Sequence, residues 1–248
     1  MTKMCKTILL IGGGPSTKLL VDYGFENIPV DTFGMGACYR YYERINWWPT
    51  YYGWLDVKTV TSHEQALKRV VEDSEIPVER YYFSRRISDS PKLTVVPHQS
   101  TGSGLFRIAR GLGYTKILLI GIECKYVERI KESRPLTKQE SDVFRARVGP
   151  PISELDSYFG KNLLTITETP EHNPNYFFHG YQQEGDVYSK PNVAISHAVS
   201  WRRLRKQYWQ HLTIEVVNCS PSSKLKFKRR GLVKELDKCR SCQMQMES

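Results

Sequence analysis

The stretch TILLIGGGPS, residues 7–16, determines how this chain begins to fold. Its apolar run, Ile8–Ile11, has the length and composition of a strand that is buried on both faces of a parallel sheet. Three glycines follow at once, and a Pro-Ser pair after them is typical of the first turn of a helix. We therefore predict a strand, a tight turn and a helix, with the turn at the carboxyl end of the strand.

The alternation of strand-length apolar runs with helix-period segments continues along most of the chain. We predict strands over Thr7–Ile11, Val30–Phe33, Tyr51–Val57, Val78–Phe83, Leu93–Val96, Lys116–Ile120 and Thr213–Val217. We predict helices from about Ser16 and over Ala37–Ile45, His63–Glu72, Gly104–Leu112 and Ala194–His211. This pattern is typical of an α/β fold, a mainly parallel sheet with helices on both faces.

Length and composition exclude several classes of protein. The 248 residues are enough for one large α/β domain or two small ones, and 40% hydrophobic with 12% aromatic residues excludes a chain that is disordered throughout. The six cysteines show no framework spacing, which favours a reducing compartment. The first apolar run is too short for a signal peptide, and no run is long enough to span a membrane. We expect a cytoplasmic protein.

The charge is strongly basic and uneven. Thirty-six lysines and arginines against 26 acidic residues give a formal net charge of +10, which favours phosphates, nucleotides, nucleic acids or anionic membranes as partners. We predict one domain over residues 1–222 and a basic tail over 223–248. The tail would contact the inner face of an anionic membrane peripherally, bind nucleic acid, or remain solvated.

The pattern of strands and helices breaks down over about residues 123–192. Six of the 13 prolines fall there, and apolar runs are few. Connections of this length are uncommon unless they act as lids or binding loops. We predict a lid-like or acceptor-binding insertion within the domain.

Two loops rich in glycine and hydroxyl side chains each follow a predicted strand. The first contains Gly12, Gly13, Gly14, Pro15 and Ser16, and the second is Ser100-Thr101-Gly102-Ser103-Gly104. Glycine lets a phosphate approach the backbone, and the helix that follows offers free N–H groups. Both loops should meet at the carboxyl edge of the sheet, where nucleotides bind in such folds. The alternatives are a tight βα turn for the first loop and a plain helix cap for the second.

Together with Leu112-Gly113-Tyr114, Ile120-Gly121-Ile122-Glu123 and Cys219-Ser220-Pro221-Ser222-Ser223, these loops resemble the bacterial sialyltransferases of glycosyltransferase family 42. They equally resemble the related motility-accessory and uncharacterised bacterial proteins that share this core. The similarity covers roughly residues 6–126 and 194–227. It implies a Rossmann-like domain that transfers a sugar from a CMP-activated donor to a surface-glycan acceptor, with inversion and without a metal or other cofactor.

The resemblance also implies which residues contact the nucleotide. By position these are the first loop, Gly36, Asp56, and the group Ser100, Thr101 and Gly102. The family's sialyltransferases have asparagines where this chain has Gly13, Gly36 and Asp56. Without these amides, the contacts that the site offers to the base and ribose differ from those of the sialyltransferases. At Asp56, a carboxylate suits ribose hydroxyls but repels phosphate.

A histidine is the general base in that family, and the matching position lies within one residue of His197. His197 shares a helical face with Trp201, Leu204 and Tyr208, and it lies near the positive end of its helix, which favours the neutral imidazole that a base needs. The alternative is a core histidine that is bonded to a carbonyl. His179, in the insertion, is the reserve candidate and a possible acceptor contact.

The family binds the leaving phosphate with tyrosines that follow the Gly-Ile-acid strand end. Here Tyr126 is the candidate for this role, with Lys125 beside it as a phosphate contact or as a solvated lysine. Cys239 and Cys242 form half of a zinc pattern without a second pair, so no metal site is predicted.

These observations favour a metal-independent, sialyltransferase-like glycosyltransferase whose partners are a nucleotide sugar, most plausibly CMP-linked, and a glycan acceptor. One alternative is a non-catalytic nucleotide- or nucleic-acid-binding module on the same fold, which the basic charge and the missing asparagines favour. Another is a different Rossmann-type enzyme such as a methyltransferase. The latter is disfavoured because Asp31 stands at the start of the second strand, and not at its end.

Overall fold

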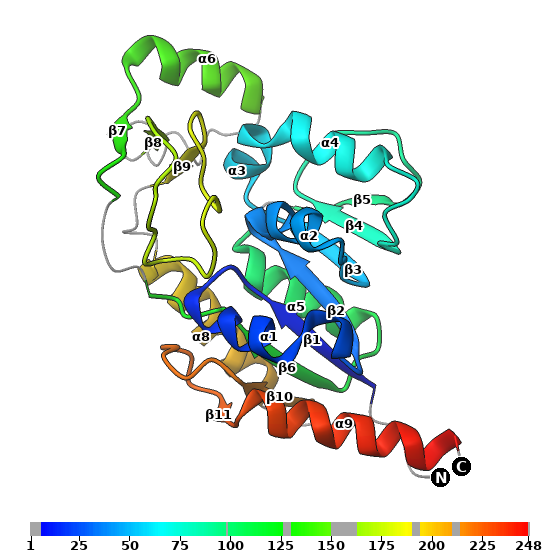
Figure 1. The fold of residues 1–248 in the computed structure, drawn as a ribbon. Helices are drawn as coiled ribbons and strands as arrows, with labels where there is room; N and C mark the ends of the chain where they lie inside the picture. Colours follow the sequence, from blue (N-terminus) through cyan, green and yellow to red (C-terminus); the bar gives the residue numbers. More distant parts are fainter. Residues whose placement is uncertain are drawn as a thin grey trace.

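A computed structural model describes residues 6–97, 99–125, 130–149, 163–189, 194–209 and 214–247. The main sheet has eight strands in the order β11-β10-β6-β1-β2-β3-β4-β5, and every neighbouring pair is parallel (Figure 1). The strands are β1 (Thr7–Ile11), β2 (Asp31–Met35), β3 (Tyr51–Trp54), β4 (Arg80–Phe83), β5 (Leu93–Val95), β6 (Lys116–Ile120), β10 (Glu215–Asn218) and β11 (Lys228–Arg229). The predicted fold class is confirmed: this is a Rossmann-like α/β fold.

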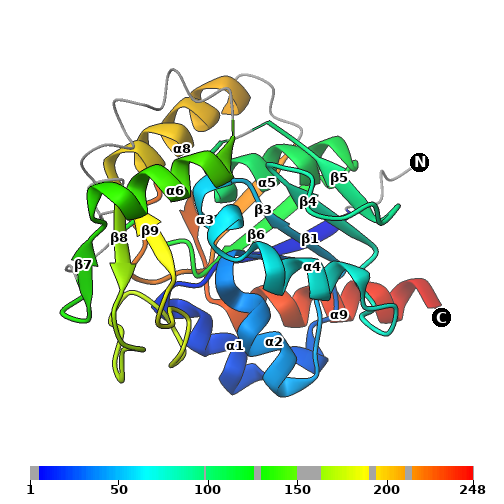
Figure 2. The same cartoon turned by 90° about the horizontal axis from the view of Figure 1, so that it is seen from above.

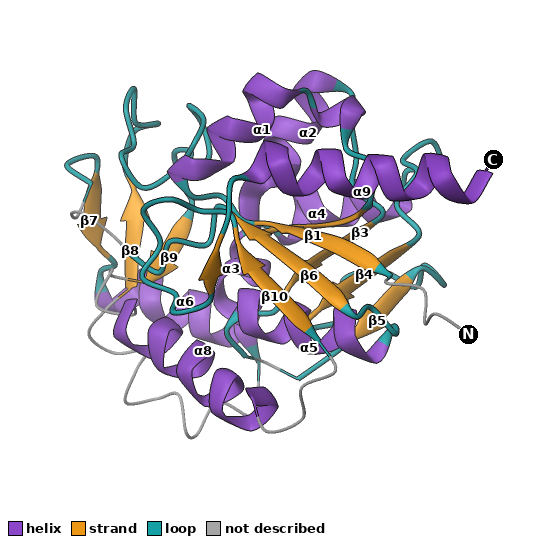
Figure 3. Ribbon diagram, turned by 90° about the horizontal axis from the view of Figure 1, so that it is seen from below, coloured by secondary structure: helices purple, strands orange, loops and turns teal. Residues whose placement is uncertain are grey.

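Helices cover both faces of the sheet (Figures 2 and 3). On one face lie α1 (Lys18–Tyr23), α2 (Tyr39–Ile45), α4 (Glu64–Glu72) and α9 (Leu232–Glu247), and on the other lie α5 (Thr101–Gly111) and α8 (Ala194–Trp209). The strands supply alternate residues to the two layers: Leu9 and Ile11 pack in the first core, and Ile8 and Leu10 in the second. All four are fully buried, as the apolar run of β1 predicts.

The strand order produces a topological switch point between β1 and β6. The chain adds β2, β3, β4 and β5 on one side of β1, then crosses back through α5 to place β6 on the other side. In open α/β sheets, ligands bind outside the carboxyl ends of the strands at such a point.

Most predicted elements are present, with one correction near the site. The predicted strand Tyr51–Val57 ends at Trp54, and a helix that we did not predict, α3 (Val57–Ser62), begins three residues later. Asp56 starts this helix, because its carboxylate accepts a hydrogen bond from the Lys58 N–H at 3.1 Å. The predicted strand includes only Val57 of α3, and residues 58–62 belong to no predicted element.

The insertion contains more regular structure than its composition indicates. Strands β7 (Ser133–Pro135), β8 (Leu163–Ile166) and β9 (Val187–Ser189) form a separate antiparallel sheet, and α6 (Lys138–Val148) lies beside it (Figure 1). A small cluster around Phe144 and Leu163 packs against Val57 of α3. The insertion is therefore joined to the main domain next to the switch-point edge.

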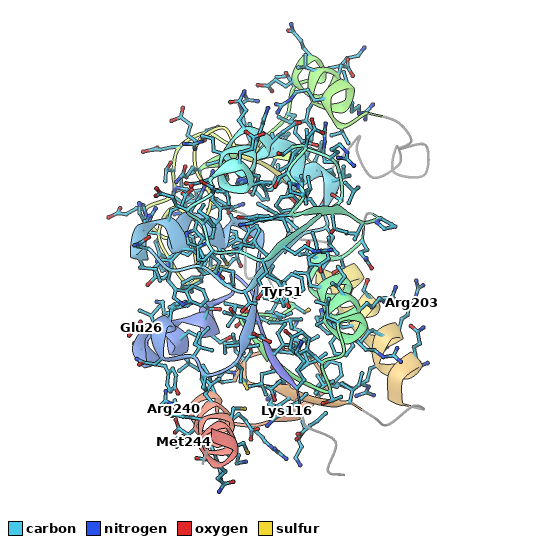
Figure 4. All side chains as sticks on the ribbon, turned by 90° about the vertical axis from the view of Figure 1, so that its right-hand side faces the viewer. Glu26, Tyr51, Lys116, Arg203, Arg240 and Met244 are labelled. Atoms are coloured by element: carbon cyan, nitrogen blue, oxygen red, sulfur yellow. The ribbon has the colours of Figure 1, made fainter. Side chains whose placement is uncertain are left out.

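The C-terminal segment packs on the domain, so of the three alternatives the solvated tail is wrong. Phe227 lies edge-on against Trp201 at 5.9 Å, β11 extends the main sheet, and α9 buries Leu232 and Leu236 in the core. Farther along α9, Arg240 donates a hydrogen bond to the Asn27 carbonyl at 2.8 Å. Figure 4 shows Arg240 and Met244 on this helix. The spacing of the two buried leucines among charged residues is that of a helix with a narrow apolar stripe.

A buried ion pair attaches α9 to the sheet. The Glu235 carboxylate has no exposed surface, lies 2.7 Å from the Lys116 Nζ on β6, and also bonds Lys238 and Arg230. Burial opposes ionisation of Glu235, but hydrogen bonds from Lys116 and Lys238 prevail and lower its pKa to about 2. Glu235 therefore stays charged at neutral pH.

We predict that Glu235→Ala lowers the free energy of unfolding by about 3 kcal/mol or more, because it leaves the Lys116 ammonium buried without its main partner. Lys238→Ala removes a half-exposed partner of the same carboxylate and should cost less than about 1 kcal/mol. Urea denaturation of the three proteins measures both values. Equal losses for the two variants would show that the pair does not anchor α9.

Candidate functional site

A cavity of about 400 Å³ opens at the carboxyl edge of the sheet, beside the switch point. Its walls are formed by the turns after β1, β2 and β6, by the starts of α3, α5 and α8, and by the end of the insertion. Both glycine-rich loops predicted from the sequence line it, as does His197. The predicted meeting of the two loops at one sheet edge is therefore what the structure shows.

The turns after β1 and β6 touch backbone to backbone. A Cβ on Gly12 would lie 2.3 Å from the Gly121 oxygen, and one on Gly121 would lie 2.3 Å from the Gly12 oxygen, so both positions require glycine. The Gly14 N–H donates to the Gly121 carbonyl at 2.9 Å. This contact brings Glu123, at the end of β6, against the first loop.

The carboxylate of Glu123 occupies the anion position of the first loop. It accepts a hydrogen bond from the Ser16 N–H at 3.0 Å and another from the Ser16 hydroxyl, and it packs against Gly14 so closely that a Cβ there would clash. Glu123 is only 6% exposed. A phosphate at this helix start would therefore have to replace a carboxylate that the chain already supplies.

The second loop keeps its donors available. Ser100 precedes α5 but makes no side-chain capping bond, so the alternative of a plain serine cap is not what is seen. The first intrahelical bond runs from the Gly104 N–H to the Ser100 carbonyl, which leaves the N–H groups of residues 101–103 at the end of the helix. The Thr101 hydroxyl oxygen accepts from the Leu55 N–H at 3.0 Å and can still donate its hydrogen.

Three ionisable side chains gather on the wall between these loops. Asp56 and Lys58 come from the start of α3, and His197 from the start of α8. Burial lowers the pKa of His197, the charge of Asp56 opposes this, and the charge of Lys58 adds to it. His197 is therefore a neutral imidazole at physiological pH, and Lys58, which is 7% exposed, is a cation at the cavity wall.

A second histidine lies deeper in the same wall. The Nδ1 of His63 is 3.1 Å from the Tyr39 hydroxyl, and its Nε2 is 3.5 Å from an Asp186 oxygen. Asp186 also forms a two-bond ion pair with Arg40, at 2.6 and 2.9 Å. Burial lowers the pKa of His63 to about 4 even though Asp186 favours its protonation, so His63 is neutral too.

Tyr181 of the insertion fills the space between the turns after β1 and β2. Its ring stacks on Tyr176 with centroids 3.6 Å apart, and its hydroxyl accepts a hydrogen bond from the Ala37 N–H at 3.2 Å. A Cβ on Gly13 would lie 2.3 Å from this ring, and one on Gly36 would lie 2.4 Å from its hydroxyl. Tyr181 therefore fills the space that a side chain would need at positions 13 and 36, two of the positions where the resemblance expects asparagine.

The predicted site residues divide into two groups. Gly12, Gly13, Gly14, Gly36, Asp56, Ser100, Thr101, Gly102, Lys125 and His197 line the cavity. Pro15, Ser16 and His179 do not; the exposed His179 bonds the Glu171 carbonyl at 3.0 Å instead. Tyr126 lies outside the described residues. The roles of all these side chains remain predictions.

Sequence reasoning missed five side chains of the site: Lys58, His63, Glu123 in its contact with Ser16, Tyr181 and Asp186. Lys58 lies just after the predicted strand, which ends at Val57, and His63 is the first residue of the next predicted helix, so no motif marked either of them. Tyr181 and Asp186 lie in the insertion, whose sequence carries no periodic signal that would place a residue against α2. For Glu123 the signal was present, since an acidic residue ends the β6 segment.

The described part of the chain holds neither a metal-ligand cluster nor a membrane-spanning helix. No group of three or more histidine, cysteine or acidic side chains there could hold a metal ion. Likewise, none of the helices in those ranges has both the length and the apolar character that are needed to cross a bilayer.

Comparisons with known proteins identify the fold. No protein-family model matches the chain, and no curated protein sequence does so significantly. Among solved structures, the MAf glycosyltransferase from Magnetospirillum magneticum AMB-1 superposes with a TM-score of 0.51 at 13% identity. The match covers 97% of this chain and 38% of that one. The chain shares the fold of part of this protein. At such identity the likeness concerns the fold alone, and the specific resemblance to sialyltransferases remains a prediction.

The depressed pKa of His63 should make stability depend on pH. The unfolded chain binds a proton at His63 near pH 6.5, whereas the folded chain does so only near pH 4, so acid favours unfolding between these values. His63 should contribute a loss of up to about 3 kcal/mol over this range. The measurement is denaturant unfolding at a series of pH values.

His63→Gln should show a flatter stability profile between pH 6.5 and 4 than the wild type, while His172→Gln, at an exposed position in the insertion, should keep the wild-type profile. Parallel profiles for the wild type and His63→Gln would contradict the assignment of a buried neutral imidazole.

Proposed function

We propose that the chain is a glycosyltransferase that takes a nucleotide-activated sugar, CMP-linked most plausibly, and transfers the sugar to a glycan hydroxyl without a metal. The observation that carries this proposal is the cavity that unites the α5 N-terminus, Lys58 and a neutral His197 at the switch point. The fold shared with a MAf glycosyltransferase supports it.

The donor phosphate would bind at the second loop. The N–H groups of residues 101–103 and the Thr101 hydroxyl are hydrogen-bond donors, and Lys58 supplies a positive charge on the same wall. The first loop is a poorer place because Glu123 already accepts the hydrogen bonds of the Ser16 N–H and hydroxyl. In place of a metal, these donors and Lys58 would stabilise the charge that develops on the leaving phosphate.

His197 would act as the general base. In the reaction, the acceptor oxygen forms a bond to the anomeric carbon, and the bond from that carbon to the phosphate oxygen breaks, with its electron pair leaving on the nucleotide. The acceptor proton passes to an imidazole nitrogen of His197. A neutral imidazole is the form that can accept it, and burial maintains that form.

The insertion would shape the acceptor side of the site and exclude water. Its residues Asn175, Gln182 and Tyr188 line the cavity across from the loops. Water competes with the acceptor for the activated sugar, so a wall that limits its access favours transfer over hydrolysis. This is the function that we propose for the insertion.

Nucleotide binding is the first test. We expect CMP, or another member of a panel of CMP, CDP, UMP, UDP and GDP, to raise the melting temperature by several degrees near saturation, because a ligand at about 100 times its Kd adds about 2.7 kcal/mol. If UDP or GDP were the stabilising ligand, the proposed donor would change to a sugar linked to that nucleotide, and the proposed transfer reaction would stand. Stabilisation by a short oligonucleotide alone, with steep loss in salt, would favour the non-catalytic nucleic-acid module instead.

The second test concerns His197. His197→Asn should lower the transfer rate by about 10²–10⁴-fold and leave nucleotide affinity within a few-fold of the wild type. Because the pKa of His197 is lowered, the wild-type rate should hold as pH falls past 6.5 and decline only below it. A variant that loses nucleotide binding, or a wild-type rate that halves above pH 6.5, would contradict the role of base.

A further inference from the structure

The space that Tyr181 occupies has the properties of a site for a planar ring. We call this space the ring slot; it is bounded by Gly13, Gly36, the Ala37 N–H and the Tyr176 ring. The Tyr176 ring offers an aromatic face, the two glycines leave room, and the backbone N–H recognises an acceptor atom at the edge of the ring. Flat heterocycles such as nucleobases bind to protein by stacking on aromatic side chains combined with such hydrogen bonds.

Two arginines of α2 hold Tyr181 in the ring slot. Arg40 donates a hydrogen bond to the Tyr181 carbonyl at 2.9 Å and pairs with Asp186, and Arg44 donates to the His179 carbonyl at 2.8 Å. The arginines are one helical turn apart and therefore lie on one side of α2. They fasten residues 177–186, which we call the strap, over the turns after β1 and β2.

A second contact joins the strap to the first loop. The Phe177 N–H donates to the Gly13 carbonyl at 3.1 Å, and the Phe177 and Phe178 side chains are buried in the core. The strap thus has a buried root at Phe177 and Phe178, whereas Tyr181 is only half-buried and faces the cavity. Tyr181 can therefore leave the ring slot while Phe177 and Phe178 stay buried in the core.

Resting on the nucleotide-binding function proposed above, we propose that Tyr181 is an internal occupant of the ring slot and that the base of the nucleotide binds by displacing it. Tyr181 fills the space left by Gly13 and Gly36, so the two rings cannot be bound together. The apparent affinity equals the intrinsic affinity multiplied by the fraction of molecules whose slot is open, so a mostly filled slot weakens binding. Tyr181 therefore determines affinity, and it selects bases that stack on Tyr176 well enough to replace it.

The test compares nucleotide affinity by calorimetry, with CMP as the first probe and the rest of the panel after it. Tyr181→Ala should bind at least about 10-fold more tightly than the wild type, because the slot is open in all molecules. Tyr181→Phe keeps the ring and should stay within a few-fold of the wild type. Glu184→Ala changes an exposed side chain of the strap that does not line the cavity, and it should match the wild type.

A second measurement uses the unmodified protein and does not depend on the folding of a variant. Saturating nucleotide should increase hydrogen exchange at strap residues 179–186 and leave α9 unchanged, because displacement of Tyr181 loosens the strap. Strap exchange that stays the same or slows on binding would contradict the proposal.

The outcomes separate the two proposals. Equal affinities of the wild type and Tyr181→Ala, or weaker binding by Tyr181→Ala, would show that Tyr181 does not compete with the ligand, while nucleotide binding itself would stand. If no nucleotide of the panel binds either protein, the proposed function fails and this inference fails with it.

Discussion

The turns after β1 and β6 meet at a distance that only glycine allows on both sides, and the site is built around this contact. Gly12 and Gly121 approach with no room for a Cβ on either, so the first loop and the end of β6 form one unit. Glu123 then reaches the Ser16 N–H. The run after β10 secures the same unit, because the Ser223 hydroxyl donates to the Ile122 carbonyl and the Lys224 N–H to the Glu123 carbonyl. A larger residue at position 12 or 121 would separate these elements and change the floor of the cavity.

Because of this contact, the two loops differ in what they can bind. The first loop resembles a phosphate site in sequence, but its anion position is satisfied from within the chain by Glu123. Among the described residues, no carboxylate accepts a hydrogen bond from the start of α5, and the second loop lines the same cavity as Lys58 and His197. The asymmetry gives a physical reason for a donor phosphate to prefer the second loop. It also relates the glycines at positions 13 and 36 to Tyr181, which occupies the space that asparagine side chains would need.

The sheet could be predicted from the sequence, whereas the contacts of the insertion could not. Apolar runs such as Ile8–Ile11 and Ile117–Ile120 are buried on both faces, so composition alone indicates a parallel sheet and places the loops at one edge. Tyr181, in contrast, meets Gly13 across more than 160 residues, and no local pattern encodes that pairing. The C-terminal helix could be predicted in part. Leu232 and Leu236 show helical spacing, but the surrounding lysines and arginines obscured it.

The proposed function requires the switch-point cavity to bind a nucleotide with its phosphate at the second loop and His197 beside the reacting carbon. A crystal structure of the chain with bound CMP tests this most directly. We expect a phosphate within hydrogen-bond distance of the Thr101 and Gly102 N–H groups and the Lys58 ammonium, with Tyr181 outside the ring slot. A phosphate on Ser16 in place of Glu123, or a nucleotide bound on another face of the molecule, would contradict it.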